Sequence, residues 1–166
     1  DRFDDPPPAD FLKWMPYSPE THRLFADTVV GTYAGSLDCP GLSGLRTVED
    51  IMASHRASGE FDPNRWGVAF FDGKPAGVLL MSRMPGRDIL DVVYMGLLPN
   101  YRGRGIGKAV LYQAVQWARR YHCDWITLAV DSANTPAMRL YQRSGFTETS
   151  RRCAWIACPP RTHTSA

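Results

Sequence analysis

The segment Ile89-Leu-Asp-Val-Val-Tyr-Met-Gly-Leu-Leu-Pro-Asn-Tyr-Arg-Gly-Arg-Gly-Ile-Gly107 carries the clearest structural signal in this sequence. Residues 89–98 are mostly β-branched, aromatic or aliphatic, which is typical of a strand, and Pro99 ends that run. A glycine-rich turn follows. In residues 105–122 apolar side chains then recur every three or four positions, as they do in an amphipathic helix. The segment therefore predicts a strand, a glycine turn and a long helix, in that order.

The glycine turn has the composition of an anion-binding loop. Glycines let a ligand approach backbone N–H groups closely, and those groups lie at the positive end of the helix dipole. Three basic residues near the helix start, Arg102, Arg104 and Lys108, oppose this dipole by about 0.3–1 kcal/mol each at exposed sites unless an anion lies there. The spacing matches neither a Rossmann fingerprint, which needs Gly in place of Lys108, nor a Walker loop, which needs Ser or Thr in place of Ala109. The turn favours a phosphate-bearing ligand, with an ordinary helix start as the alternative.

A second patterned segment runs Asn134-Thr-Pro-Ala-Met-Arg-Leu-Tyr-Gln-Arg-Ser-Gly-Phe146. In a helix over residues 136–144, Leu140 and Tyr141 lie on one face, and Gly145 can end the helix in the left-handed conformation. Taken alone, this pattern describes a helix that packs on a core, with Tyr141 as a core aromatic residue. The functional interpretation depends on finding it together with the glycine turn.

The remaining apolar patterns complete an α/β domain. Helical spacing after Pro19 predicts one helix, and a Thr-x-x-Asp capping box at Thr47 predicts another. Strand-forming runs separated by Asp-Gly and Pro-Gly turns predict an antiparallel meander, and two more strands follow later. The predicted order is ααβββαβαβ with a mixed sheet. Helices are expected at residues 20–33, 48–55, 105–122 and 136–144, and strands at 66–71, 76–81, 89–98, 125–130 and 146–157.

Length and composition indicate one domain with its own hydrophobic core. The chain has 166 residues, a net charge of +2 and 44% hydrophobic residues, which argues against disorder and against a nucleic-acid footprint. It has no apolar run of about 18 residues and no signal-peptide pattern, so we expect a cytoplasmic protein without a membrane partner. The four cysteines form no Cys-x-x-Cys pair, and we expect no metal site. We expect an N-terminal arm or linker at residues 1–17, one domain at 18–158 and a tail at 159–166.

Together the two motifs resemble those of the GNAT superfamily of acetyl-CoA-dependent N-acetyltransferases. Arg102-x-x-Gly105-x-Gly107 looks like its pyrophosphate loop, and Asn134-x-x-Ala137-x-x-Leu140-Tyr141-x-x-x-Gly145-Phe146 looks like its second cofactor motif. The resemblance covers about residues 65–157. It implies a single domain whose mixed, mostly antiparallel sheet has splayed central strands, with room for an extra strand near the N-terminus. It also implies acetyl-CoA as the co-substrate.

The resemblance assigns roles to particular residues. The backbone of Met95, Gly96 and Leu97 would pair with the pantetheine arm like an added strand, and Gly96 suits the bulge that relatives have there. Asn134 would bond the pantetheine or order water, and Tyr141 would stand beside the cofactor sulfur. The pyrophosphate would lie against the amides of the glycine turn, and Lys108 would lie beside them. These amides belong to Arg102, Gly103, Arg104, Gly105, Ile106 and Gly107. On the helix of the second motif, Arg139 and Arg143 would meet either a phosphate of the nucleotide or solvent.

Attack by an amine on a thioester requires a neutral amine, a stabilised oxyanion and a proton for the leaving thiolate. Tyr141 is the candidate acid, because its phenolic O–H can donate to sulfur. Asp91 resembles in position the glutamate base of some lysine-acetylating relatives, although its shorter side chain would act through water. Tyr94 and Asp131 are rival bases. The structural alternatives are a solvated Asp91, a core Tyr94, and an Asp131 that bonds the turn before Asn134.

The predicted function is transfer of an acetyl group from acetyl-CoA to a primary amine of a small molecule or a peptide by direct attack. The alternative is a non-catalytic acyl-CoA-binding module that regulates a partner and is fused to a missing domain. Loops at residues 35–46 and 58–65 are expected to select the acceptor. Their acidic residues, Asp38 among them, would favour a cationic amine or are simply solvated. Scattered arginines without a recognition motif do not support nucleic-acid binding, and a homodimer stays open.

Overall fold

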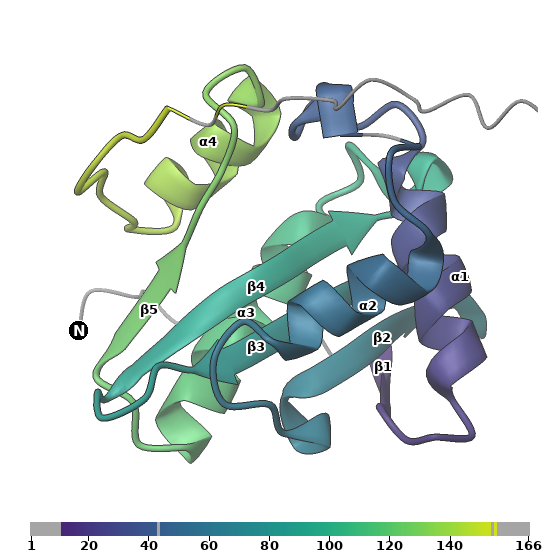
Figure 1. Ribbon diagram of the computed structural model, residues 1–166, viewed down its shortest axis with the longest axis horizontal. Helices are drawn as coiled ribbons and strands as arrows, with labels where there is room; N and C mark the ends of the chain where they lie inside the picture. The colour runs from purple at the N-terminus through teal and green to yellow at the C-terminus, as the bar shows by residue number, and fades with distance from the viewer. Residues whose placement is uncertain (1–10, 43, 154, 156–166) are drawn as a thin grey trace, which may run out of the picture.

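The computed structural model describes residues 11–42, 44–153 and 155, which form a five-stranded sheet with helices on both faces (Figure 1). The strands lie in chain order, and each pairs with the next in antiparallel fashion except the last pair, which is parallel. Helices α1 and α2 cover one face and α3 covers the other. The strands are β1 (Leu12–Pro16), β2 (Trp66–Phe71), β3 (Lys74–Arg83), β4 (Ile89–Leu97) and β5 (Trp125–Leu128), and the helices are α1 (His22–Tyr33), α2 (Val48–Arg56), α3 (Ile106–Arg120) and α4 (Thr135–Arg143).

The alternation of side chains along β3 divides the hydrophobic core into two layers. Leu79 and Met81 belong to the core beneath α3, whereas Val78 and Leu80 belong to the core beneath α1 and α2. This follows from the period of two along a strand. A strand that is covered on both faces has no solvent-facing side, which is why β3 reads as a continuous apolar run. Packing on both faces fixes β3, and β3 in turn holds β4 through its backbone pairing.

Most predicted elements are present, with ends that differ by a few residues. The capping box of α2 is formed: the Thr47 hydroxyl accepts from the Asp50 N–H, and the Asp50 carboxylate accepts from the Thr47 N–H. Helix α1 begins at His22 rather than at residue 20. The reason is a preceding turn, in which the Thr21 N–H donates to the Ser18 carbonyl at 3.1 Å.

The structure differs from the predictions at both ends of the domain. The predicted arm, residues 1–17, overlaps the sheet, because Leu12–Pro16 forms β1 along β2 and Tyr17 is buried. This is the extra strand that the resemblance allowed, whereas residues 1–10 and the tail at 159–166 lie outside the described residues. The predicted last strand at 146–157 is contradicted over its described part, since residues 146–153 and 155 contain no strand. The alternation of apolar and polar residues in this segment is only partial. The strand β5, beside which it would pair, has only four residues and offers few backbone partners. The observed order is βααβββαβα.

Strands β4 and β5 separate partway along their length. β5 pairs with β4 only from Ile89 to Val92, and residues 93–97 of β4 have no partner on that side within the described part of the chain. Figure 1 shows the two strands diverging toward the end of the sheet where α4 lies. The divergence begins at a bulge, in which Val93 is the extra residue between the partners of Leu80 and Met81. The predicted splay is confirmed, but the bulge lies at Val93 and not at Gly96.

Gly96 lies where α1 packs directly against β4. A Cβ atom at this position would meet Thr32 Oγ1 at 2.7 Å and the Tyr94 hydroxyl at 2.8 Å. These two hydroxyls are hydrogen-bonded to each other at 2.7 Å. Because the Thr32 hydroxyl donates to the Val29 carbonyl at 2.6 Å, the Tyr94 hydroxyl is the donor within the pair. The pair fills the space that any side chain at position 96 would need.

Gly96→Ala is expected to lower the free energy of unfolding by about 1–3 kcal/mol, because the methyl group must displace a hydrogen-bonded pair at a packed interface. Denaturant unfolding at an unchanged m value measures this. Gly41→Ala is the control, since no atom lies within 4 Å of its Cβ position, and a change below about 0.5 kcal/mol is expected. Equal stability of the two variants would contradict the close packing of α1 on β4.

Candidate active site

The diverging edge of β4 presents backbone groups that no neighbouring strand of the described chain uses. Met95, Gly96 and Leu97 lie in this part of β4, between the bulge at Val93 and the end of the strand. An extended backbone with free N–H and C=O groups can pair with an extended ligand, as happens when a peptide adds a strand to a sheet. The three residues therefore lie where a strand-like ligand arm could bind, although the Leu97 carbonyl already accepts from Arg102 Nε and the Gly96 carbonyl faces Gly77 on β3.

The glycine turn brings the start of α3 to the end of this edge. Gly103 and Gly105 have φ angles of 71° and 80°, a left-handed conformation that other residues rarely adopt. Gly105 is the N-cap of α3 and offers no side-chain acceptor to the first helical N–H groups. A Cβ atom at Gly107 would meet Leu140 Cδ2 at 3.3 Å, so this glycine also allows the close approach of α4. Ile106 is buried beneath the turn and anchors it, so the turn has the geometry that an anion-binding loop needs.

The side chain of Arg102 binds the protein's own backbone. Its guanidinium donates to the carbonyl oxygens of Thr32 (2.7 Å), Ala34 (2.9 Å) and Gly35 (3.1 Å), and its Nε donates to that of Leu97 (3.0 Å). Carbonyls at the C-terminal end of a helix lack helical donors and carry partial negative charge, so an arginine there is favourable. Arg102 thus joins the glycine turn to the end of α1. Its charge needs no bound anion, which corrects that part of the electrostatic prediction.

The other predicted phosphate contacts divide into available and occupied groups. The N–H groups of Arg102 and Lys108 donate to the carbonyls of Pro99 and Gly105, so these two amides are occupied. Within the described residues the N–H groups of residues 103–107 have no backbone acceptor. These five amides remain available, and the predicted pyrophosphate contact of the loop from Arg102 to Gly107 stays a prediction.

The Arg104 side chain also has a structural contact. Its guanidinium lies over the rings of Phe71 and Tyr101, with its carbon 5.2 Å and 5.9 Å from the two ring centroids. This stacking holds the arginine beside the turn through cation–π attraction. Lys108, in contrast, is exposed on the first turn of α3. Of the three basic residues near the helix start, Lys108 is the one whose charge no described residue engages.

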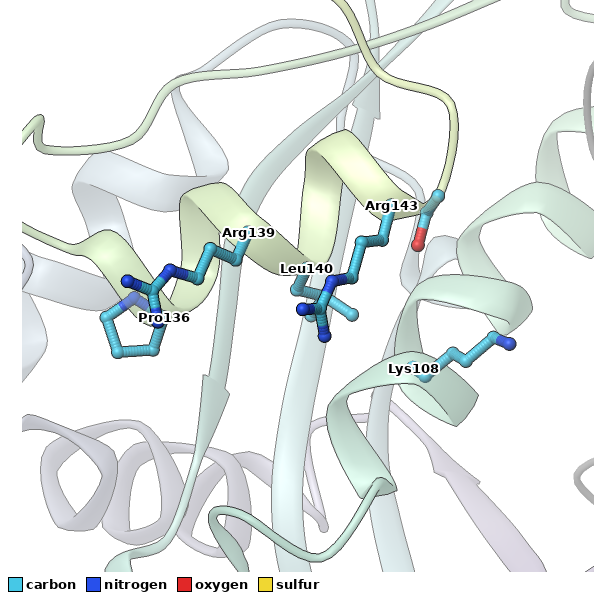
Figure 2. A pocket seen from close by; sticks show the side chains of 6 residues that line it. Lys108, Pro136, Arg139, Leu140 and Arg143 are labelled. Carbon is cyan, nitrogen blue, oxygen red and sulfur yellow. The ribbon is translucent and has the colours of Figure 1, made fainter.

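A basic pocket of about 430 Å³ opens between α3 and α4 (Figure 2). Figure 2 shows Arg139 and Arg143 extending from α4, with Leu140 between them, while Lys108 projects from α3. None of these three cations is ion-paired with a described residue. Uncompensated positive charge beside a row of free amides suits a phosphorylated ligand. The pocket is lined by Lys108, Pro136, Arg139, Leu140, Arg143 and Ser144.

Asn134 acts as the N-cap of α4. Its side-chain oxygen accepts from the Ala137 N–H at 3.3 Å, and its own N–H donates to the Asp131 carbonyl at 2.9 Å. A capping oxygen satisfies one of the helical N–H groups that have no partner in the first turn. The NH₂ group of Asn134 has no hydrogen-bond partner among the described residues, and the predicted contact of Asn134 with the pantetheine stays a prediction.

Tyr141 lies on the inner side of α4 and packs against the core beneath α3. Burial, together with the nearby charge of Asp38, raises the pKa of Tyr141 to about 12. The phenol therefore keeps its proton across the neutral range, as a proton donor must. The sequence indicated both a core aromatic and an acid, and a half-buried Tyr141 is compatible with both.

The three candidate bases have different surroundings. Asp91 lies on the part of β4 that is still paired with β5, and its Oδ1 accepts from the Thr127 hydroxyl at 2.5 Å. Its neighbours Leu90 and Val92 belong to the core beneath α3, so Asp91 lies on the opposite face of the sheet, beside α1 and α2. Asp91 thus has a defined hydrogen-bond partner, and its role as base stays a prediction.

The rival bases have the structural roles that the sequence left open. Burial raises the pKa of Tyr94 far above its usual range, and its ring contacts Tyr33 and His55 at centroid distances of 5.5 Å and 5.2 Å. The Asp131 carboxylate accepts from the N–H groups of Ala133 (2.8 Å) and Cys39 (3.1 Å), which lowers its pKa. Tyr94 is a core residue and Asp131 organises the turn before α4.

Two contacts in this region gave no signal in the sequence. Thr32 reaches Tyr94 from α1, and Asp38 reaches the backbone of Asp131 from the loop after α1. Both contacts join segments far apart in the chain, and periodicity reports only near neighbours. The sequence predicted that the loop around Asp38 selects the acceptor, with an acidic side chain that favours a cationic amine or is solvated, but it gave no sign of the contact with Asp131. Among the described residues, no group of three His, Cys, Asp or Glu side chains could hold a metal ion, and no helix could cross a membrane.

Comparison with known proteins agrees with this geometry. A family model described as "Acetyltransferase (GNAT) family" matches residues 40–146. Mycothiol acetyltransferase from Beutenbergia cavernae is 32% identical over 107 residues, which cover 63% of this chain and 35% of that protein. The chain therefore spans about a third of the length of this relative.

Solved structures show the same fold. A GNAT family acetyltransferase from Streptococcus pneumoniae has a TM-score of 0.65 and 26% identity, with 87% of this chain and 91% of that chain covered. A GNAT family acetyltransferase from Elizabethkingia anophelis with acetyl-CoA bound has a TM-score of 0.64 and 16% identity, with 85% and 79% covered. The family model includes the glycine turn, the diverging strands and α4, and the chain belongs to the acetyltransferase (GNAT) family.

Proposed function

We propose that this protein transfers an acetyl group from acetyl-CoA to an amine. The observation that carries the proposal is the divergence of β4 and β5 beside the uncapped start of α3. It combines an extended edge, which suits a pantetheine arm, with free amides, which suit a pyrophosphate. Membership of the family, one of whose structures holds acetyl-CoA, supports the same co-substrate.

The pantetheine arm, the pyrophosphate and the remaining phosphate of acetyl-CoA would each meet a different surface of this chain. The backbone of Met95, Gly96 and Leu97 would bind the pantetheine arm, and the amides from Gly103 to Gly107 would bind the pyrophosphate. The basic pocket between α3 and α4 would take the remaining phosphate charge. In this arrangement the thioester would lie along the diverging edge, on the same side as Tyr141.

Direct transfer needs few groups from the protein. The neutral amine attacks the thioester carbonyl, the new C–N bond forms and the C–S bond breaks. Tyr141 would donate its proton to the departing thiolate, and the proton lost by the amine would pass to Asp91 through water. The raised pKa of Tyr141, about 12, keeps it in the donor form needed for this step.

The alternative is a module that binds acyl-CoA without turnover. Thiol release from acetyl-CoA, followed with a panel of primary amines and a peptide with a free N-terminus, distinguishes the two. Amine-dependent release with stoichiometric acetylated product is expected for the enzyme. Saturable acetyl-CoA binding without release on any amine would instead establish the module.

Tyr141→Phe is expected to lower kcat by about 10²–10⁴-fold, because the variant keeps the aromatic ring and loses only the proton donor. The loss should be nearly constant from about pH 6 to pH 9, since the raised pKa keeps Tyr141 protonated throughout. Steady-state kinetics and acetyl-CoA titration measure both effects. Weakened acetyl-CoA binding with an unchanged kcat would show that Tyr141 only packs.

Asp91→Asn is expected to reduce kcat/KM and to remove the low-pH limb of the pH–rate profile, because the amide cannot accept the proton of the amine. Thr127→Val provides a finer test. It removes the hydrogen bond that orients the Asp91 carboxylate, so kcat/KM should fall, but by less than in Asp91→Asn. Profiles that coincide with that of the native protein would exclude Asp91 as the base.

Replacing both Arg139 and Arg143 by Gln is expected to raise the Kd for acetyl-CoA by about tenfold or more at low ionic strength, because charge-assisted contacts to phosphate are lost. The difference should shrink as salt screens the pocket. Arg23→Gln on the exposed face of α1 is a control, since it removes a positive charge from a residue that does not line this pocket. Calorimetric titration at two salt concentrations measures the effect, and equal Kd values would place both arginines in solvent.

A further inference from the structure

The loop after α1 is held on both sides of the diverging strands. On the β4 side, Arg102 donates to the carbonyl oxygens of Ala34 and Gly35. On the β5 side, the Cys39 N–H donates to the Asp131 carboxylate at 3.1 Å. In Figure 1 this loop extends from the end of α1 toward α4. Residues 35–39 therefore connect the two sides of the opening.

This loop presents one carboxylate that is only half used. Asp38 Oδ1 accepts from the Asp131 N–H at 2.8 Å, which fixes the side chain. Its Oδ2 has no hydrogen-bond partner in the described part of the chain, and the residue is exposed. The carboxylate of Asp131 differs, because both its oxygens accept from backbone N–H groups. The oxygen left for a ligand belongs to Asp38.

The charge of Asp38 reaches the region of the proposed chemistry. It contributes to the raised pKa values of Tyr33 on α1, Tyr94 on β4 and Tyr141 on α4. Burial is the main cause of all three raised pKa values, and the charge of Asp38 adds to it. Tyr141 is the proposed acid, so the charge of Asp38 acts on a group of the proposed chemistry. Arg102 does not neutralise Asp38, because its donors are directed at carbonyl oxygens.

We propose that the free oxygen of Asp38 binds an ammonium group of the acceptor other than the amine that is acetylated. The inference rests on the proposed acetyl transfer and narrows its acceptor to amines with a second positive charge. A charged hydrogen bond to a fixed carboxylate would hold the second ammonium group while the neutral amine approaches the thioester. The cations of the basic pocket lie on the cofactor side, so the two substrates would meet surfaces of opposite charge.

The test compares two acceptors of equal length with the full chain and acetyl-CoA. One is butane-1,4-diamine, and the other is 4-aminobutan-1-ol, in which a hydroxyl replaces the second ammonium. Asp38→Asn keeps an oxygen to accept from the Asp131 N–H and removes the charge. Its kcat/KM for the diamine should fall by about 10–100-fold, mainly through a higher KM. Its kcat/KM for the amino alcohol should stay unchanged, which also shows that the variant is folded.

The outcomes separate this inference from the function on which it rests. Equal losses with both acceptors, or a loss confined to kcat, would make Asp38 a base or a structural residue and overturn the inference. So would a native protein without preference for the diamine. Thiol release with the amino alcohol upholds acetyl transfer in each of these cases, whereas no release with any amine overturns both. Asp72→Asn, the same charge change in the β2–β3 turn, should leave the preference intact.

Discussion

The pairing of β4 with β5 ends at Val92, and the rest of the site follows from that limit. A backbone group inside a sheet is already hydrogen-bonded, so a fully paired β4 would have nothing to offer a ligand. The bulge at Val93 turns the strand away from β5 and frees the edge that follows it. The same divergence leaves room for α4 beside α3. On the other side of β4, Arg102 joins the glycine turn to the end of α1 and so holds the two together.

The opening also separates charge. Lys108, Arg139 and Arg143 line the pocket between α3 and α4. Asp38 lies outside this pocket, on the loop after α1 that contacts the Asp131 backbone. Tyr141 lies close enough to this carboxylate for its pKa to respond. A net charge of +2 hides this arrangement, because the charges nearly cancel over the whole chain. The local field and not the total charge is what an anionic cofactor and a cationic amine would meet.

Local patterns predicted the elements well, because each depends on nearby residues. The capping box at Thr47, the turn at Gly105 and the period of α3 are all of this kind. Three features could not be found in this way. The bulge at Val93 depends on the register between β3 and β4, and the pair of Thr32 with Tyr94 depends on how α1 packs. The partial alternation after Phe146 predicted a strand that the described residues do not form, since such a pattern says nothing about an available partner.

Within the two motifs, some side chains hold the fold while backbone groups stay free, so the motif letters alone do not say which groups would bind a ligand. Arg102 and Asn134 are specified residues of the two motifs, and their side chains bind the protein's own backbone. The groups left for phosphate are N–H groups of residues 103–107, and every residue except proline supplies such a group. A sequence therefore specifies this surface indirectly, through the glycines that shape the turn and the side chains that hold it. Substitutions at Arg102 would act first on the shape of the opening and only through it on the ligand.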